Sequence, residues 1–121
     1  MTAMTARLRI TTDDGSPIAW AGVADGPVSR AIGLLRHRRL EPGEGLLLVP
    51  ARLLHTWFMR FPIGVAFLDR AGCVVAVADP VPPFCVCWGG WRSRMALEVP
   101  AGHLTRLGVR PGMRLGLRCP P

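Results

Sequence analysis

Residues 65–78 have the sequence VAFLDRAGCVVAVA, and this stretch decides how the chain folds. Two apolar runs, 65–68 and 73–78, flank the four-residue connection 69–72, which ends in glycine. Glycine adopts the positive φ that a tight connection between strands often requires. Short apolar runs separated by a turn sequence are typical of paired strands. The stretch therefore predicts a β-hairpin.

Further short strands are expected on both sides of this hairpin. Residues 46–49, LLLV, show no polar alternation, which is typical of a strand buried on both faces. Strands are also expected at 18–24, 95–99 and 113–117. Residues 80–91 contain three prolines and a glycine pair, so we expect a loop there with at most a short edge strand.

Two short helices are expected. Pro27 suits the first turn of a helix, and apolar residues then recur at helical spacing up to the basic group 36–39. Residues 103–107 resemble one helical turn, which Gly108 would end. Many short strands, two short helices and no alternation of strand with helix indicate a mainly β (α+β) fold class, a small antiparallel β-barrel-like domain.

The chain is expected to form a single domain over residues 1–121. Half of the residues are hydrophobic and 19% are charged, which suffices for one core, placed at about residues 17–118. Residues 1–16 contain few large apolar side chains, so we expect a loose or short-stranded lead-in. No apolar stretch is long enough to span a bilayer, and no export signal is visible. We therefore expect a soluble, cytoplasmic protein with reduced thiols.

The net charge of +7 comes from fifteen arginines against eight acidic residues, and the chain has no lysine. Asparagine, glutamine and tyrosine are also absent, a pattern that G/C-rich coding largely explains. After residue 80 six arginines face one acid, Glu98, with Trp88 and Trp91 among them. Those arginines are Arg92, Arg94, Arg106, Arg110, Arg114 and Arg118. Arginines interleaved with aromatic rings can bind phosphates and stacked bases, so nucleic-acid binding is one hypothesis and a solvated basic surface is its alternative.

The segment 55–63, with the sequence HTWFMRFPI, combines the most varied side chains of the molecule. A two-residue period places His55, Trp57 and Met59 on one face of a strand there. Both faces of such a strand would be partly apolar. The segment is therefore the first candidate for a functional surface.

His55 and Glu98 could form a catalytic pair if the strand at His55 lies beside the strand 95–99. In that arrangement His55 could transfer protons near neutral pH and Glu98 could orient its ring. The structural alternative is a satisfied, partly buried His55, with Glu98 paired to an arginine such as Arg60 or Arg36. Covalent catalysis is poorly supported, because no serine stands in a Gly-x-Ser-x-Gly context.

Cys85 and Cys87 would lie on one face of a strand, and Cys73, Cys119 and His103 are conceivable further metal ligands. The one-residue spacing is not the spacing typical of structural zinc. Small core cysteines are the simpler interpretation, and Cu(I) is the one metal retained as an idea. We expect no metal and no cofactor.

Five motifs occur in order over about residues 28–117. They are Arg30 with GLLR at 33–36, GLLL at 45–48, HTWFMRFPI at 55–63, FLD at 67–69 with Gly72, and LEVPAG at 97–102 with LGV at 107–109 and Gly112. In this order the chain resembles the domain of unknown function family 192, small β-rich domains of bacteria and archaea with no established activity. The resemblance implies a β-rich fold and no particular reaction. Family members usually carry acidic residues at two positions where this chain has Gly64 and Met113, and those acids either serve a shared activity or close turns.

The main functional hypothesis is a non-catalytic binding or accessory module for a small molecule or a protein partner. The expected ligand-binding residues are His55, Trp57, Met59, Arg60, Arg36, Trp88 and Trp91. One alternative is a small hydrolase-like or metal-assisted enzyme that uses His55 and Glu98. The other is a nucleic-acid-binding protein that uses the arginine-rich C-terminal third.

Overall fold

The computed structural model describes residues 6–25, 43–57 and 59–118, so the helix expected after Pro27 lies outside the described residues. The fold is mostly β with a short helix, as the sequence predicts. Its elements are β1 (Ala6–Thr11), β2 (Pro17–Asp25), β3 (Glu44–Val49), β4 (Leu53–His55), β5 (Ile63–Leu68), β6 (Val74–Val81), β7 (Val86–Trp88), β8 (Met95–Pro100), α2 (His103–Leu107) and β9 (Gly116–Arg118).

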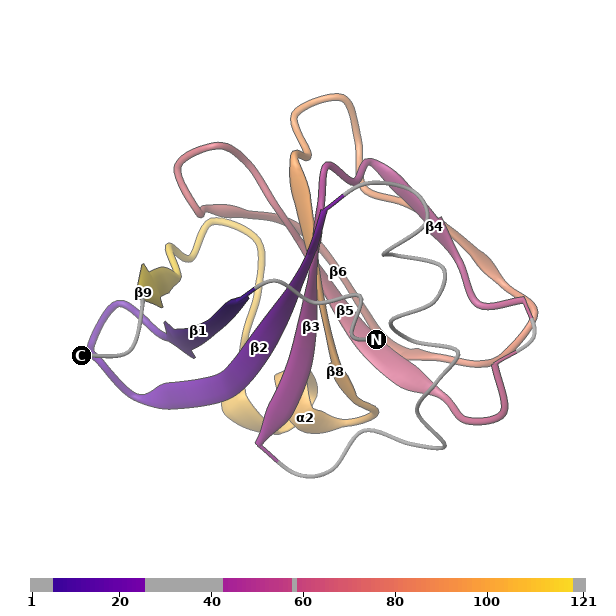
Figure 1. Ribbon diagram of the computed structural model, residues 1–121, viewed down its shortest axis with the longest axis horizontal. Helices are drawn as coiled ribbons and strands as arrows, with labels where there is room; N and C mark the ends of the chain where they lie inside the picture. The colour runs from indigo at the N-terminus through magenta and orange to yellow at the C-terminus, as the bar shows by residue number, and fades with distance from the viewer. Residues whose placement is uncertain (1–5, 26–42, 58, 119–121) are drawn as a thin grey trace.

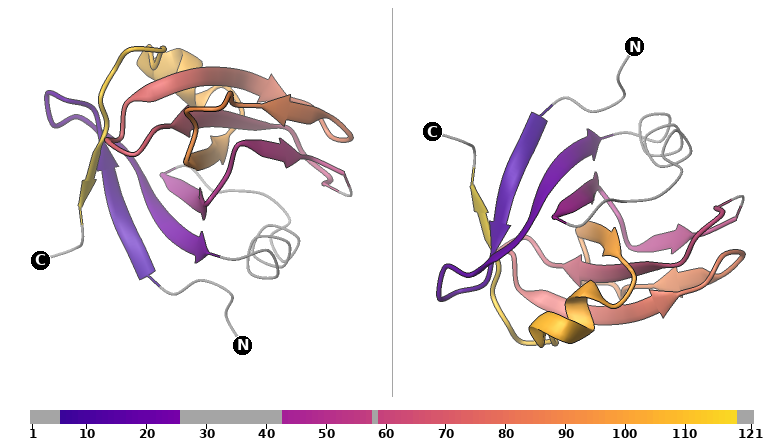
Figure 2. Two further views of the ribbon diagram at one scale, coloured as in Figure 1. Left: turned by 90° about the horizontal axis from the view of Figure 1, so that it is seen from above. Right: turned by 90° about the horizontal axis from the view of Figure 1, so that it is seen from below.

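Seven strands form one sheet in the order β6-β5-β8-β3-β2-β1-β9, and β4 pairs with β7 in a separate two-stranded ribbon. The large sheet curls into a half-barrel (Figure 1, Figure 2). In Figure 1, β1 and β9 lie at the opposite end of the molecule from β4. The two ends of the fold therefore present separate surfaces.

The central strands are buried on both faces, each face against its own apolar cluster. On β5, Ile63, Val65 and Phe67 pack into one cluster, while Ala66 and Leu68 pack into the other. The first of these is called the Phe67 cluster below, and it also includes residues of the β4–β7 ribbon. Its buried members are Leu46, Leu48, Ala51, Leu54, Met59, Ile63, Val65, Phe67, Val81 and Ala96. Burial of both faces explains why β3 and β5 show no polar alternation.

The hairpin predicted from residues 65–78 is present as β5 and β6. The Asp69 carboxylate closes its turn, because Oδ1 accepts hydrogen bonds from the backbone N–H of Ala71 (2.9 Å) and of Cys73 (3.0 Å). Gly72 has a φ of 87°, a conformation that glycine adopts without steric cost. The turn chemistry thus acts as the sequence predicts.

Within the expected loose or short-stranded lead-in, residues 6–11 form the short strand β1. β1 lies inside the seven-stranded sheet, between β2 and β9. Ile10 is fully buried and stands opposite Ala19 on one side and Leu117 on the other. The alternation of apolar and basic residues at positions 8–10 gives this short strand one apolar face, so the core begins before residue 17.

The pairing of β2 with β3 and the extent of β9 differ from what the sequence predicts. β2 and β3 pair in parallel, from Trp20 opposite Glu44 to Asp25 opposite Val49. A parallel pair needs a crossover of about a dozen residues or more, and the chain between the two strands is long enough for one. The last strand, β9, is also shorter than the predicted strand 113–117.

No helix in the described ranges has both the length and the apolar character required to cross a membrane.

Asp79 on β6 fixes the helix α2 to the sheet. Its Oδ1 accepts a hydrogen bond from the Gly102 N–H (2.6 Å), and its Oδ2 accepts from the backbone N–H (2.9 Å) and hydroxyl (3.1 Å) of Thr105. Gly102 offers no side chain to cap this five-residue helix, so the carboxylate from the neighbouring strand supplies the cap.

Replacement Asp79→Ala is expected to lower the free energy of unfolding by about 2 kcal/mol, because hydrogen bonds to a charged group contribute about 1.5–3 kcal/mol. Urea unfolding of the purified protein measures the change. Asp13→Ala, which removes an exposed carboxylate, is the matched control and should shift the free energy by less than about 0.5 kcal/mol. Equal losses in the two variants would contradict the capping role.

Candidate functional site

The β4–β7 ribbon has one face turned inward and one face turned to solvent. Leu53 pairs with Trp88, and His55 pairs with Val86. These four side chains are exposed, whereas the intervening Leu54 is buried in the Phe67 cluster. With their exposed neighbours they form the surface called the aromatic face below. Its members are Leu53, His55, Trp57, Phe84, Val86, Trp88 and Trp91.

Large apolar side chains dominate the aromatic face. Trp91 is 77% exposed, Phe84 is 68% exposed and Trp88 is 51% exposed. The Trp88 and Trp91 rings meet edge to face with centroids 5.0 Å apart. Exposed apolar patches are uncommon on soluble domains, and they often mark interaction sites.

His55 and Trp57 form a second aromatic pair on this face. Their ring centroids lie 4.9 Å apart with an interplanar angle of 32°. The Trp57 backbone N–H also donates to His55 Nδ1 at 3.3 Å. The imidazole is therefore held as part of the surface, with Nδ1 acting as an acceptor.

Thr56 holds one end of the ribbon in place, although sequence reasoning gave it no role. Its side chain is fully buried. The hydroxyl donates to the Pro82 carbonyl (2.7 Å) and accepts from the Cys85 N–H (2.8 Å), while the Thr56 carbonyl accepts from the Phe84 N–H (2.9 Å). These bonds fix the 82–86 segment against β4. The signal in the sequence was a small hydroxyl residue, Thr56, between the two aromatic residues His55 and Trp57.

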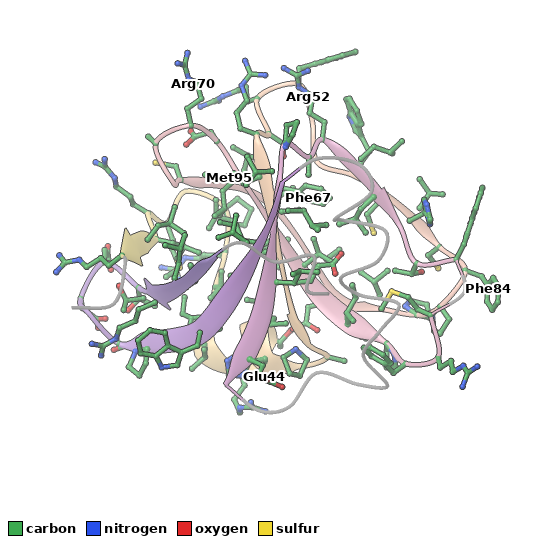
Figure 3. All side chains as sticks on the ribbon, in the orientation of Figure 1. Glu44, Arg52, Phe67, Arg70, Phe84 and Met95 are labelled. Carbon is green, nitrogen blue, oxygen red and sulfur yellow. The ribbon has the colours of Figure 1, made fainter. Side chains whose placement is uncertain are left out.

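Arg52 and Gly89 hold the other end. Arg52 Nε donates to the Trp91 carbonyl at 3.0 Å, and the Arg52 carbonyl accepts from the Gly89 N–H at 2.6 Å. Figure 3 shows Arg52 and Phe84 at opposite ends of this part of the molecule. Both ends of the aromatic face are therefore anchored by hydrogen bonds, which reduces the entropy lost when a partner binds.

The structure brings four predicted ligand-binding residues together on the aromatic face and separates others from it. His55, Trp57, Trp88 and Trp91 share the surface. Met59 lies apart from the aromatic face, because this side chain is only 7% exposed and belongs to the Phe67 cluster. The strand ends at His55, and the Met59 N–H donates to the Thr56 carbonyl in a turn, so the two-residue period does not continue. Arg60 is exposed, and Arg36 lies outside the described residues.

The proposed catalytic pair of His55 and Glu98 is not assembled. β4 pairs with β7, whereas β8, which carries Glu98, lies between β3 and β5. Glu98 is 2% exposed and stands between Leu46 and Val65 in the sheet, while His55 is turned to solvent. The short strand β4 pairs with β7, and not with the strand 95–99 that would have brought Glu98 beside His55. The alternative pairing of Glu98 with Arg60 is not formed either, since Arg60 is exposed and no ion pair joins the two described residues.

Glu98 is instead an isolated buried carboxyl. Its Oε2 has no hydrogen-bond partner among the described residues. Burial in apolar surroundings disfavours the charged form and raises the pKa of Glu98 from 4.5 to about 8. At neutral pH the group is therefore mostly protonated and neutral.

Cys85 and Cys87 both face inward, and they pack against the Phe67 cluster. Burial is the main cause that raises the pKa of the Cys87 thiol, followed by the nearby Cys85 and Glu98. A raised thiol pKa weakens both metal binding and nucleophilic attack, which need the thiolate. Within the described ranges, no three His, Cys, Asp or Glu side chains gather in a way that could hold a metal ion.

The surroundings of the aromatic face carry positive charge and no negative charge from the two segments that form it. Residues 50–68 and 80–97 contain no aspartate or glutamate. They contain four arginines, Arg52, Arg60, Arg92 and Arg94. These two segments therefore contribute positive charge and no negative charge near the aromatic face.

Fold and surface together define a small β half-barrel domain whose two-stranded ribbon carries an exposed, basic aromatic face. The chain belongs to the domain of unknown function family 192, described as uncharacterized ACR, whose model matches residues 9–117. This confirms the resemblance drawn from the motifs. No curated protein matches the chain.

Two crystal structures share the fold. One, from Sinorhizobium meliloti, is titled a "putative transcription regulator"; it is 24% identical, with a TM-score of 0.80 and coverage of 97% of both chains. The other, from Novosphingobium aromaticivorans, is a protein of unknown function; it is 20% identical, with a TM-score of 0.78 and coverage of 91% of this chain and 83% of that chain. These similarities establish the half-barrel fold.

Gly64 on β5 lies directly against the Asp79 side chain of β6. A Cβ at Gly64 would lie 2.9 Å from Asp79 Cγ, so the Asp79 carboxylate occupies the adjoining space. That carboxylate caps α2, as described above.

Proposed function

We propose that this protein is a non-catalytic binding module whose aromatic face docks a protein partner. The observation that carries the proposal is the concentration of exposed apolar side chains on the outer surface of the β4–β7 ribbon. Tryptophan and arginine are the residues most enriched at the energetic centres of protein interfaces. The face carries three tryptophans, the two segments that form it add four arginines nearby, and the support is fixed at its two ends.

The shape of the surface favours a protein over a small molecule. Small ligands bind mostly in concave sites that bury most of their surface. The aromatic face is the outward side of a two-stranded ribbon, which suits a broad contact. The positive surroundings favour a partner segment that contains both acidic and apolar residues. We therefore expect such a segment to place its apolar side chains between the two aromatic pairs.

The enzyme alternative receives no support from the described residues. His55 and Glu98 lie on opposite sides of the β4–β7 ribbon. The Ser93 side chain is fully buried, and its hydroxyl donates to the Ala51 carbonyl at 2.6 Å. The raised pKa of Cys87 opposes thiolate chemistry. A binding role accounts for the exposed rings without requiring any of these groups to react.

A photo-crosslinking amino acid at Val86 tests the proposal in the cells that naturally produce the protein. The expected result is a protein adduct whose linked peptide contains acidic and apolar residues. The same crosslinker at Arg106 on α2 is the matched control, because this exposed position lies outside the aromatic face. Adducts only to nucleic acid or lipid, or identical adducts from both positions, would contradict the proposal.

Substitution Trp88→Ala is expected to weaken binding of the crosslinked partner, once purified, by about 30-fold, which corresponds to about 2 kcal/mol. The free energy of unfolding should change by only about 1 kcal/mol or less, because the ring is half exposed and loses chiefly its contact with Trp91. Calorimetric titration and urea unfolding measure the two quantities. A large loss of stability with unchanged affinity would assign Trp88 a structural role.

A further inference from the structure

A second functional surface lies on the outer face of β1, β2 and β9. The register places Trp20 opposite Arg9, and Arg9 opposite Arg118, so the three side chains form one row across three strands, which Glu44 of β3 continues beyond Trp20. The adjacent row, Ala19, Ile10 and Leu117, points into the core. All three outward side chains are exposed, and Trp20 is 43% exposed.

The two arginines in this row are direct cross-strand neighbours, an arrangement that by itself disfavours pairing of the strands. Arg114, also exposed, joins them at a cavity of about 350 Å³ beside the row. Asp13 also lines this cavity, and Thr11 and Gly116 form part of its wall. In the described part of the chain, none of the three arginines forms an ion pair with a carboxylate.

The nearby acid Asp14 does not neutralise the arginines by contact. Its carboxylate accepts hydrogen bonds from the Thr12 hydroxyl and from the Ser16 N–H, the latter at 3.0 Å. The Thr12 hydrogen bond, followed by the bonds from Ser16, lowers the pKa of Asp14 to about 2. Three arginines therefore stand beside two acids, Asp13 and Asp14, and these five side chains together carry a net charge of +1.

We propose that this surface binds phosphorylated nucleotide units, either free or within a single-stranded nucleic acid. Arg9, Arg114 and Arg118 would hold phosphate oxygens, for which the guanidinium fork is well suited. Trp20 stands next to Arg9 in the row and offers an exposed ring on which a base stacks. A phosphate group also removes the repulsion between Arg9 and Arg118, so binding and strand pairing support each other.

This surface is independent of the aromatic face. β1 and β9 lie at the opposite end of the molecule from β4 (Figure 1). Of the six arginines in the C-terminal third, Arg114 and Arg118 line this cavity, and Arg9 from the first strand lines it with them. Tryptophans 88 and 91, which the sequence suggested as stacking partners, belong to the aromatic face instead.

Fluorescence anisotropy with a labelled twelve-nucleotide oligothymidylate at low salt tests the proposal. The double variant Arg9→Ala, Arg118→Ala is expected to bind at least tenfold more weakly. The slope of log K against log salt should become shallower by about 1.4, because each phosphate contact to a single strand contributes about 0.7. Arg106→Ala removes one exposed arginine elsewhere and should change the affinity less than twofold.

Competition with thymidine triphosphate and with inorganic pyrophosphate separates the ligand sources. Displacement by the triphosphate indicates a nucleotide site, and displacement by unlabelled oligonucleotide alone indicates a nucleic-acid site; both support the proposal. Trp20→Ala is expected to lower the affinity for oligonucleotide and triphosphate about tenfold and to leave that for pyrophosphate unchanged. Pyrophosphate that competes as well as the triphosphate would overturn the role of Trp20.

Substitution Arg118→Glu separates binding from folding. It places opposite charges across the β1–β9 pair, so the melting temperature should rise while oligonucleotide binding is lost. Absence of wild-type binding at low salt, an equal loss in Arg106→Ala, or full binding by Arg118→Glu would each overturn the proposal.

Discussion

The free energy of unfolding is expected to fall by about 1.4 kcal/mol for each pH unit between about pH 4.5 and pH 8. Glu98 causes this fall. In the folded protein its carboxyl keeps the proton up to about pH 8, whereas in the unfolded chain it releases the proton near pH 4.5. The folded state therefore binds more protons than the unfolded state over this range, and stability is fully present below it and is lost as the pH rises through it.

Substitution Glu98→Gln provides the decisive comparison. Glutamine has nearly the same shape and cannot ionise, so the slope over this range should largely disappear and the variant should be more stable than the wild type at pH 9. Urea unfolding at five pH values from 5 to 9 measures both. Asp13→Asn, which alters an exposed carboxylate, should keep the wild-type slope. A slope that persists unchanged in Glu98→Gln would show that Glu98 is not the titrating group.

Substitution Gly89→Ala is expected to lower the free energy of unfolding by about 3 kcal/mol, near the upper end of the usual cost of overpacking. A Cβ at Gly89 would lie 2.2 Å from an atom of the Phe67 ring, which is itself 1% exposed. Neither group can move freely, because the Gly89 N–H donates to the Arg52 carbonyl and the ring fills the Phe67 cluster. Thermal or urea unfolding detects the loss.

The contact between Gly89 and Phe67 can be verified with a double-mutant cycle. Phe67→Leu makes space at the ring position, so the double variant with Gly89→Ala should be more stable than the sum of the single losses by at least about 1 kcal/mol. Strict additivity would mean that the alanine is accommodated elsewhere.

Features with local causes could be predicted from the sequence. The β5–β6 hairpin follows from a turn that Asp69 and Gly72 close within four residues. The helical turn 103–107 follows from a stop at Gly108, which has a φ of 71°. These elements depend on neighbours in the chain, and propensity and turn chemistry describe such neighbours well.

Features that depend on residues distant in the chain could not be predicted from the sequence. The three residues of β4 contain no information that selects β7 over β8, so the sequence left open whether the His55 strand lies beside the strand 95–99. The parallel pairing of β2 with β3 likewise depends on a long connection. The exposed rings at 57, 88 and 91 come together through the ribbon register, which brings Trp88 beside the strand of His55, and through the ring contacts of Trp57 with His55 and of Trp91 with Trp88. Glu98 is buried because β3 and β5 lie on either side of it, and the residues around Glu98 in the sequence do not show this.

β6 ends the seven-stranded sheet beside β5. Its first residue, Val74, also exchanges backbone hydrogen bonds with Gly112 and Met113, so the apolar run on its open edge is VAVA at 75–78. Unpaired backbone groups on such a strand can recruit a second chain and begin a fibril. Asp79 and Pro80 follow at once, one bringing a charge and the other lacking the N–H that an added strand would need. The carboxylate that caps α2 thus has a second effect: together with Pro80 it shortens the stretch open to self-association and favours solubility at high concentration.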